Sequence, residues 1–316
     1  MGTPTRKAAR RTGIALALVA AVSACAQGHD VGAGPSGSAL PPVHVVREML
    51  GTGSLVLPIE PYLFTDRQVG RLFRARAVLT ASCMRRFGHS WPAPTATAPA
   101  TGTLNPANTA HRYGITDAGT AARYGYHPAP GTTSGQSGAK NPERRPEPAE
   151  LRVLTGLTAD GTPAATDERG RPLPAGGCEG EATAALSGDP QKIGNRELVS
   201  TINIGSYRDS QRDPRVVSVF RKWSRCMRRH GYRYSDPTQT PGKNAEFTGP
   251  TVTRAETALA GADVACKRET NVVGVWSSVD AAYQRRAMDT KRRELAAVKR
   301  DMRRQLTNAD RVLRQD

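Results

Sequence analysis

The residue with the most specific local chemistry is Cys25, which ends the segment "VSAC" near the start of the chain. Small residues at Ser23 and Ala24 allow the backbone to enter the groove of a peptidase, and the thiol of Cys25 can be diacylated. Four basic residues and an apolar run from Gly13 to Ala24 come before it. That run is about 12 residues, typical of a signal-peptide core, whereas a membrane-spanning helix needs roughly 20.

The segment "VSAC" resembles the bacterial lipobox at every position of that short motif. We therefore expect a signal peptide over residues 1–24, cleavage before Cys25, and a diacylglycerol on Cys25 that holds the protein on the outer face of the cytoplasmic membrane. Two acyl chains suffice for stable anchoring. The alternative is an ordinary signal peptide that precedes an unrelated cysteine.

Four further cysteines, an even number in a chain that we expect to be exported, favour two disulfide bonds. The segments "SCMRRFG" and "RCMRRHG" share Cys-Met-Arg-Arg, then one residue and a glycine, and each has one later cysteine. We interpret this as a weak internal repeat. It predicts the pairs Cys83–Cys178 and Cys226–Cys266.

A metal site is the alternative role for these cysteines. Structural zinc prefers CxxC or Cys/His pairs at short spacing, whereas no two of the four are closer than 40 residues. His89 and His230 lie near Cys83 and Cys226, but no second pair accompanies them. We expect no metal, and free thiols are the remaining alternative.

The sequence shows none of the common catalytic motifs: no G-x-S-x-G elbow, no H-E-x-x-H, no Walker loop and no Gly-rich dinucleotide turn. None of the six histidines stands in a motif with a candidate nucleophile. Glu179 and Glu181 follow Cys178 closely, but residues at i and i+2 of a helix face apart. We therefore predict no catalytic residue, no cofactor and no enzymatic activity.

Capping signals indicate the helices that carry the repeated cysteines. Thr65 and Gln68 form a capping box before a helix over residues 66–87, and Gly88 stands where a left-handed C-cap belongs. Asp213, followed by proline, starts a helix that stops at Gly231.

Further helices are expected after Thr116 or Asp117, near Glu179, over residues 195–208, and after a capping box of Thr253 and Glu256. A loose hairpin fits residues 151–177. Two "RYG" copies flank the short helix after residue 117, and their tyrosines either form a recognition surface or cover that helix.

The last segment, from about Val272 to Leu313, contains no proline, and its only glycine is Gly274. It predicts one long C-terminal helix. At 1.5 Å per residue, forty residues would measure about 60 Å, so the distal end should project or fold back. An apolar stripe along it can pack on the body or on a partner helix: Leu295, Val298, Met302, Leu306, Ala309 and Leu313.

Residues 285–316 hold eleven Lys or Arg and five acidic residues. A solvated helix face is one interpretation of these charges. The other is contact with an anionic surface through the basic residues of the distal half: Arg292, Arg293, Lys299, Arg300, Arg303 and Arg304.

The fold class that these patterns predict is mainly α, a disulfide-tied helical domain with long Pro/Gly/Thr-rich loops and a long C-terminal helix. The expected organisation is a signal peptide (1–24), the lipidated cysteine and tether (25–60), and a helical extracytoplasmic domain (61–316). Disordered inserts are expected near residues 92–110 and 128–149, which are rich in Pro, Thr, Ala, Gly and Ser.

The net charge is +17, and loss of the four basic residues of the signal peptide leaves 17 − 4 = +13. Such a charge inside a cell would suggest nucleic acid. Outside the membrane the available anions are lipid headgroups and wall polymers. We therefore expect no nucleic acid as partner, but the membrane through Cys25, and an anionic wall polymer or another envelope protein.

Four segments resemble a group of uncharacterised actinobacterial, Streptomyces-type secreted lipoproteins: "SCMRRFG", "RYGITDAGTAARYGYH", "RCMRRHGYRYSDP" and "ADVACKRETNVVGVWSSVDAAYQRR". The resemblance covers most of residues 60–315. It implies a lipid-anchored extracytoplasmic protein and brings no activity with it. The function expected is a non-catalytic binding or accessory module of the cell envelope. The alternatives are an envelope hydrolase of unknown type and a structural assembly protein.

Overall fold

Side-chain caps set where several helices begin. In the computed structural model, which describes residues 39–91, 109–127, 146–189, 196–239 and 251–315, Thr65 and Gln68 form the predicted capping box. Asp213 accepts a hydrogen bond from the backbone N–H of Arg215. These bonds satisfy backbone donors that the first turn of a helix leaves unpaired.

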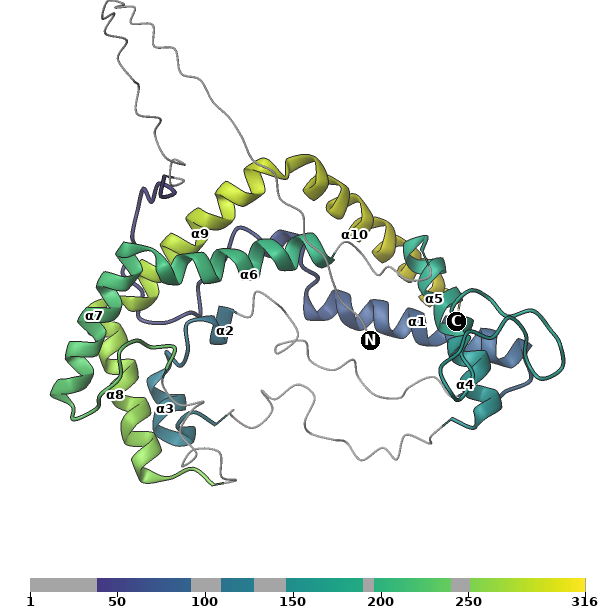
Figure 1. Cartoon of the computed structure of the whole chain (residues 1–316), viewed down its shortest axis with the longest axis horizontal. Helices are drawn as coiled ribbons and strands as arrows, with labels where there is room; N and C mark the ends of the chain where they lie inside the picture. Colours follow the sequence, from purple (N-terminus) through teal and green to yellow (C-terminus); the bar gives the residue numbers. More distant parts are fainter. Residues whose placement is uncertain (1–38, 92–108, 128–145, 190–195, 240–250, 316) are drawn as a thin grey trace, which may run out of the picture. The chain divides into compact units, whose positions relative to one another are not determined.

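The chain is mainly helical, as predicted, and its described residues contain no strand beyond isolated bridges (Figure 1). The elements are η1 (Glu60–Tyr62), α1 (Asp66–Arg86), α2 (Thr109–Arg112), α3 (Ala118–Tyr124), α4 (Pro148–Thr155), α5 (Gly177–Ser187), α6 (Arg196–Arg212), α7 (Pro214–Arg229), α8 (Arg254–Thr270), α9 (Val272–Thr290) and α10 (Arg292–Leu313).

The helices from Leu40 onward form two packed groups within one compact unit. Helices α1, α4, α5 and α10 pack on one another, and α3, α6, α7, α8 and α9 form the second group. The largest apolar cluster lies in the second group, where Trp223 of α7 and Trp276 of α9 are fully buried. A smaller cluster joins α6 to α10 through Val199, Ile202 and Leu295.

Both predicted disulfide bonds are present, and each ties a helix of one Cys-Met-Arg-Arg segment to a second helix. Cys83 of α1 is bonded to Cys178 of α5, and Cys226 of α7 to Cys266 of α8. The two Cys-Met-Arg-Arg helices also end alike. Gly88 and Gly231 each adopt a positive φ directly after the helix, at 83° and 86°, which favours glycine because it has no Cβ.

The repeat extends to the partner helices. Arg86 lies three residues after Cys83 and pairs with Glu181, three residues after Cys178, at 2.6 Å. Arg229 and Glu269 hold the equivalent positions beside Cys226 and Cys266, and they pair at 2.5 Å. Each disulfide is thus accompanied by an ion pair in the same register. The weak sequence repeat therefore corresponds to a repeated three-dimensional unit of two bonded helices.

The predicted continuous C-terminal helix is wrong in one respect, because it breaks at Lys291 (φ −121°, ψ 25°) into α9 and α10. The two halves bury different faces. Helix α9 packs on α6 and α7, whereas α10 packs on α1 and α5. A straight helix could not cover both groups, so the chain changes direction between them (Figure 1).

The tether is predicted to extend to residue 60, but the chain contacts the helices well before that point. Leu57 and Ile59 are buried. The backbone N–H of Met49 donates to Asn271, which lies between α8 and α9, and that of Ile59 donates to Gln284 of α9. The helical domain therefore includes residues before 60, because partly buried side chains of this segment pack against the largest apolar cluster, and Leu57 and Ile59 belong to the cluster that joins α6 to α10.

Other predicted boundaries shift by a few residues. Helix α4 begins at Pro148, inside the predicted 128–149 insert, and α2 begins at Thr109, inside the 92–110 insert. Residues 92–108 and 128–145 of these inserts lie outside the described residues. The loose hairpin expected over 151–177 is confirmed only in part, since α4 continues to Thr155 and the antiparallel pairing after it is limited to the isolated bridges Leu157–Pro163 and Thr166–Pro172. No described helix is both long and apolar enough to cross a membrane.

Candidate anion-binding groove

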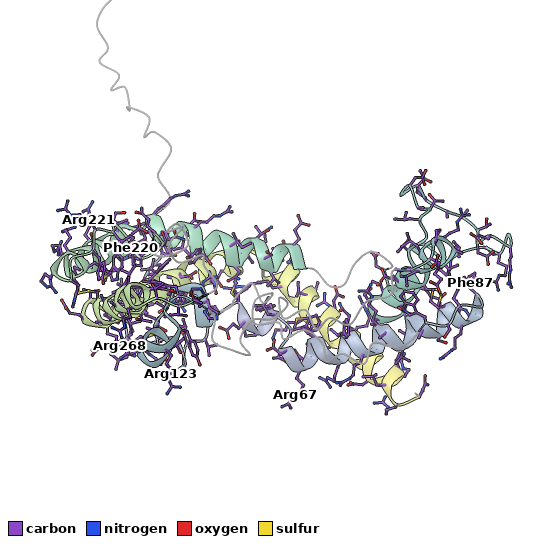
Figure 2. All side chains as sticks on the ribbon, turned by 90° about the horizontal axis from the view of Figure 1, so that it is seen from below. Arg67, Phe87, Arg123, Phe220, Arg221 and Arg268 are labelled. Carbon is purple, nitrogen blue, oxygen red and sulfur yellow. A yellow bond between two sulfur atoms is a disulfide. The ribbon has the colours of Figure 1, made fainter. Side chains whose placement is uncertain are left out.

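Helix α7 is amphipathic, with a buried apolar face and an outer basic face. Its inner face buries Val216, Phe220 and Trp223 against α8 and α9. Its outer face carries Arg221, which projects from the helix as Arg67 and Arg123 project elsewhere (Figure 2). Arg225 and Arg228 follow at i+4 and i+7, so the three guanidinium groups share one face of the helix.

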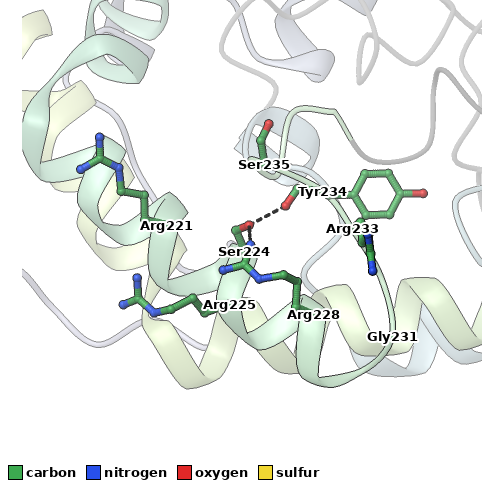
Figure 3. A pocket seen from close by; sticks show the side chains of 8 residues that line it. All are labelled: Arg221, Ser224, Arg225, Arg228, Gly231, Arg233, Tyr234 and Ser235. Carbon is green, nitrogen blue, oxygen red and sulfur yellow. Dashed lines mark hydrogen bonds between the residues drawn. The ribbon is translucent and has the colours of Figure 1, made fainter.

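The segment after α7 folds back along this face. Gly231 turns the chain, and the hydroxyl of Ser224 donates to the carbonyl oxygen of Tyr234 at 2.6 Å. One Arg228 Nη donates to the same hydroxyl at 2.9 Å (Figure 3). The helix and the returning segment enclose an open groove of about 870 Å³, the arginine groove. Its lining is Arg221, Ser224, Arg225, Arg228, Gly231, Arg233, Tyr234 and Ser235.

The arginine groove contains four cations and no acidic residue in its lining. Arg221, Arg225 and Arg233 make no ion pair with any described residue, and Arg228 bonds only to Ser224. Elsewhere on the molecule, arginines such as Arg71 and Arg86 have carboxylate partners. Guanidinium groups bind phosphate and carboxylate through paired N–H donors. The groove can therefore bind an anion with several charged groups.

A second pocket, the aromatic pocket, has a volume of about 220 Å³. Pro237 and Thr238, from the segment that also lines the arginine groove, form part of its wall. The other lining residues are His111, Arg112, Tyr113, Gly114, Ile115, Tyr126, Tyr207 and Trp276. They come from α2, α6, α9 and the segments around α3, so only the fold brings them together.

A buried ion pair anchors one side of the aromatic pocket. Arg112 pairs with Asp280 at 2.6 Å, and their side chains are 6% and 0% exposed. The Tyr113 hydroxyl donates to the same carboxylate at 2.8 Å. Burial and the neighbouring Asp280 raise the pKa of Tyr113 well above its usual value, so this hydroxyl stays protonated as a donor. This side of the pocket is rigid, and its charges are paired.

The apolar stripe predicted for the C-terminal helix lies inside the protein. Leu295, Val298 and Met302 are buried, and α10 packs against α1 and α5. Leu306 is half-buried in the same contact. The stripe is therefore not available to a partner helix, because helices of this chain cover it.

The basic residues of α10 remain on the outside, but several already have partners. Arg292 pairs with Asp289 and Arg304 with Asp301, while Lys299 lies 4.9 Å from the ring centre of Tyr62. Arg293, Arg300 and Arg303 are exposed and make no ion pair within 4 Å with any described residue. Unlike the α7 arginines, they line neither of the two pockets described above.

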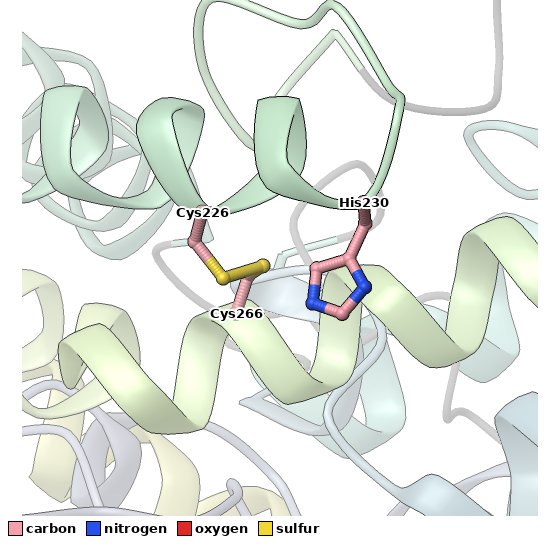
Figure 4. A group of neighbouring side chains, drawn as sticks. All are labelled: Cys226, His230 and Cys266. Carbon is pink, nitrogen blue, oxygen red and sulfur yellow. A yellow bond between two sulfur atoms is a disulfide. The ribbon is translucent and has the colours of Figure 1, made fainter.

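Cys226, His230 and Cys266 are close enough for their ligand atoms to lie within 4.8 Å of one another (Figure 4). The two sulfur atoms are bonded to each other, whereas metal binding needs thiolates. In this oxidised form the group offers a metal only the exposed His230. Cys25 lies outside the described residues.

The remaining candidates from the sequence are tied into ion pairs. Glu179 and Glu181 pair with Arg76 and Arg86 of α1, which separates the two carboxylates.

The predicted capping box at α8 forms only in part. Thr253 accepts from the N–H of Glu256, but the buried Glu256 carboxylate turns inward to His127.

Comparison with known protein families, curated proteins and solved structures finds no significant match to this chain. The resemblance to actinobacterial lipoproteins therefore stays a prediction. The arginine groove was missed in the sequence, although a signal was present: the 221, 225 and 228 spacing opposite the buried stripe of α7. Arg233 gave no such signal, because a loop brings it to the groove.

Proposed function

We propose that this protein is a lipid-anchored, extracytoplasmic and non-catalytic binding module of the cell envelope, and that its ligand is an anionic wall polymer. The observation that carries the proposal is the arginine groove, which four arginines line without a carboxylate. The export signal and the "VSAC" segment supply the expected location.

A polymer fits this groove better than a single small anion. The groove is open along α7 and measures about 870 Å³, and its cations are spread over three helical positions and the returning segment. Successive charged groups of a chain can each meet one arginine. Such contacts are individually weak at a surface, so affinity depends on their number and on ionic strength.

The groove is tested by replacing three of its arginines in the full-length chain purified in detergent. Arg221→Gln, Arg225→Gln and Arg233→Gln together should weaken binding of poly(glycerol phosphate) by roughly 10- to 100-fold, at about 1 kcal/mol or somewhat less for each arginine. The dependence of log affinity on log salt should flatten by about one for each arginine–phosphate pair that the substitutions remove. Isothermal titration at two salt concentrations measures both effects.

The matched control removes the same charge from α10. Arg293→Gln, Arg300→Gln and Arg303→Gln leave the groove intact and should change affinity by less than about threefold, because these residues line no groove and long-range attraction is screened beyond about 8 Å at physiological salt. Equal weakening in the two triple variants would show attraction by net charge alone. The arginine groove would then not be the binding site.

The anchor is tested separately through Cys25. Cys25→Ser should abolish acylation in an actinobacterial host, and the protein should remain an unprocessed precursor or appear in the medium. Intact-mass measurement of the membrane and medium fractions distinguishes these fates. A variant that stays membrane-bound with unchanged processing would contradict lipidation at this cysteine.

A further inference from the structure

The aromatic pocket and the arginine groove share one wall. Arg233, Tyr234 and Ser235 line the groove, and Pro237 and Thr238 line the pocket. Pro237 is four positions after Arg233, so the two residues are at most about 14 Å apart along the chain. The backbone N–H of Thr238 donates to Asp236 at 3.0 Å and helps hold the segment in a turn. One extended ligand can therefore reach both sites.

The aromatic rings of the pocket are held in fixed positions. Trp276 stacks with Tyr207 at a centroid distance of 5.3 Å and meets Tyr113 edge-on at 5.0 Å. The Trp276 Nε1–H donates to Ser210 at 2.9 Å. Trp276 and Tyr113 are almost fully buried, so the partly exposed rings of Tyr207 and Tyr126 supply most of the aromatic surface of the pocket.

Free hydrogen-bonding capacity remains at the pocket. The Tyr207 hydroxyl and the Nη1 of Arg112 make no hydrogen bond to any described residue. Burial raises the pKa of Tyr207, so its hydroxyl stays neutral. Pockets that combine apolar walls with a few polar groups favour ligands with both kinds of surface. A sugar ring, with C–H faces and hydroxyl edges, is such a ligand.

Charge argues against an ionic ligand in the aromatic pocket. Asp280 neutralises Arg112, so the pocket lacks the excess positive charge of the arginine groove. Aromatic pockets can also bind organic cations. Here, however, the Arg112 guanidinium already lies over the Tyr207 ring, 4.8 Å from its centre, so that side of the ring is not open to a second cation. The aromatic pocket has a volume of about 220 Å³, below the roughly 300 Å³ of pockets that bind drug-sized ligands. This smaller volume suits a single ring.

We propose that the aromatic pocket binds a sugar ring of the same polymer whose phosphate groups occupy the arginine groove, so that the ligand is a glycosylated phosphate polymer. This inference rests on the proposed function, and it adds the chemistry that distinguishes one polyanion from another. The arginine groove binds the phosphate groups, and the aromatic pocket binds the sugar ring.

The test compares three probes on the full-length chain in detergent: inorganic polyphosphate, poly(glycerol phosphate), and the same poly(glycerol phosphate) carrying glucosyl groups. The wild-type protein should bind the glucosylated polymer about tenfold more tightly than the plain one. Tyr207→Ala should remove that preference and leave the affinity for polyphosphate unchanged. Tyr207→Phe keeps the ring and should retain part of the preference, so it separates a recognition defect from a folding defect.

Tyr124→Ala is the matched control, because Tyr124 lies on α3 and lines neither site. It should keep the full preference. Equal binding of plain and glucosylated polymers by the wild type would overturn the sugar-binding inference while leaving the groove in place. Failure of all three probes to bind would overturn the proposed function itself. Single-stranded RNA binding as tightly as the glucosylated polymer would also overturn the inference, by showing that the pocket accepts a base.

Discussion

Replacing Cys83 and Cys178 together with alanine is expected to lower the free energy of unfolding by about 5 kcal/mol, and replacing Cys226 and Cys266 by about 4 kcal/mol. The difference follows from the lengths of chain closed by the two bonds, 95 and 40 residues, because a longer loop loses more entropy in the unfolded chain. Alanine is preferred to serine, since all four sulfur positions are buried and a hydroxyl there would add its own cost.

Urea unfolding of each double variant, with and without a reductant, measures this effect. The reductant should destabilise the wild type by the combined contributions and each double variant only by the remaining bond. Non-reducing peptide maps should show the surviving pair in each case. A double variant that unfolds at the wild-type urea concentration would show that its disulfide contributes nothing to stability.

The Cys226–Cys266 disulfide also helps to position the residues of the arginine groove. Cys226 lies between Arg225 and Arg228 on α7 and ties that helix to α8. The turn that follows brings Arg233 to the helix through the Ser224–Tyr234 hydrogen bond. Loss of this disulfide should therefore weaken polymer binding as well as stability, whereas loss of Cys83–Cys178, in the other helix group, should affect stability alone.

The second large effect is expected from Asp280→Ala, which should lower the free energy of unfolding by about 3–5 kcal/mol, because it leaves the Arg112 charge buried without a partner. It also removes the acceptor of the Tyr113 hydroxyl. The hydrogen bonds that remain to Arg112 are those to the Asn203 carbonyl and, at 3.5 Å, to the Ser206 hydroxyl. Chemical unfolding monitored by circular dichroism measures the loss.

A matched ion pair at the surface provides the control. Asp310 pairs with Arg71 at 3.3 Å, but the two side chains are 38% and 33% exposed, so Asp310→Ala should cost less than about 1 kcal/mol. Adding Arg112→Met to Asp280→Ala should recover most of the stability, since the uncompensated charge disappears. Similar costs for Asp280→Ala and Asp310→Ala would contradict the view that burial governs this pair.

Local signals were sufficient for the helices and the disulfides. Thr65 with Gln68, and Asp213 with the following proline, mark helix starts because a cap depends only on residues within one turn. The Cys-Met-Arg-Arg segments predicted the right pairs, since each helix and its later cysteine form one unit. The matching Arg–Glu pairs beside both bonds were also present in the sequence, but only the structure showed that they meet.

Long-range packing decided what local patterns left open. The apolar stripe containing Leu295 and Met302 could pack inside this chain or against a partner helix, and the sequence pattern does not distinguish the two. The structure shows that the stripe is internal, because α1 and α5 cover it. No proline or glycine marks the helix break at Lys291 in the sequence. It arises because α9 and α10 bury their apolar faces in different helix groups. The same packing drew residues 41–59 onto the domain.

The sequence by itself determined the helical class and the disulfide pairs, because each depends on a short motif or on periodicity, and it predicts export with a lipid on Cys25. Only the tertiary structure decided where ligands can bind. The arginine groove needs Arg233 to return beside α7, and the aromatic pocket joins Arg112, Tyr207 and Trp276 from three helices. Sites of this kind depend on how separate elements pack, and spacing along the chain carries little information about that.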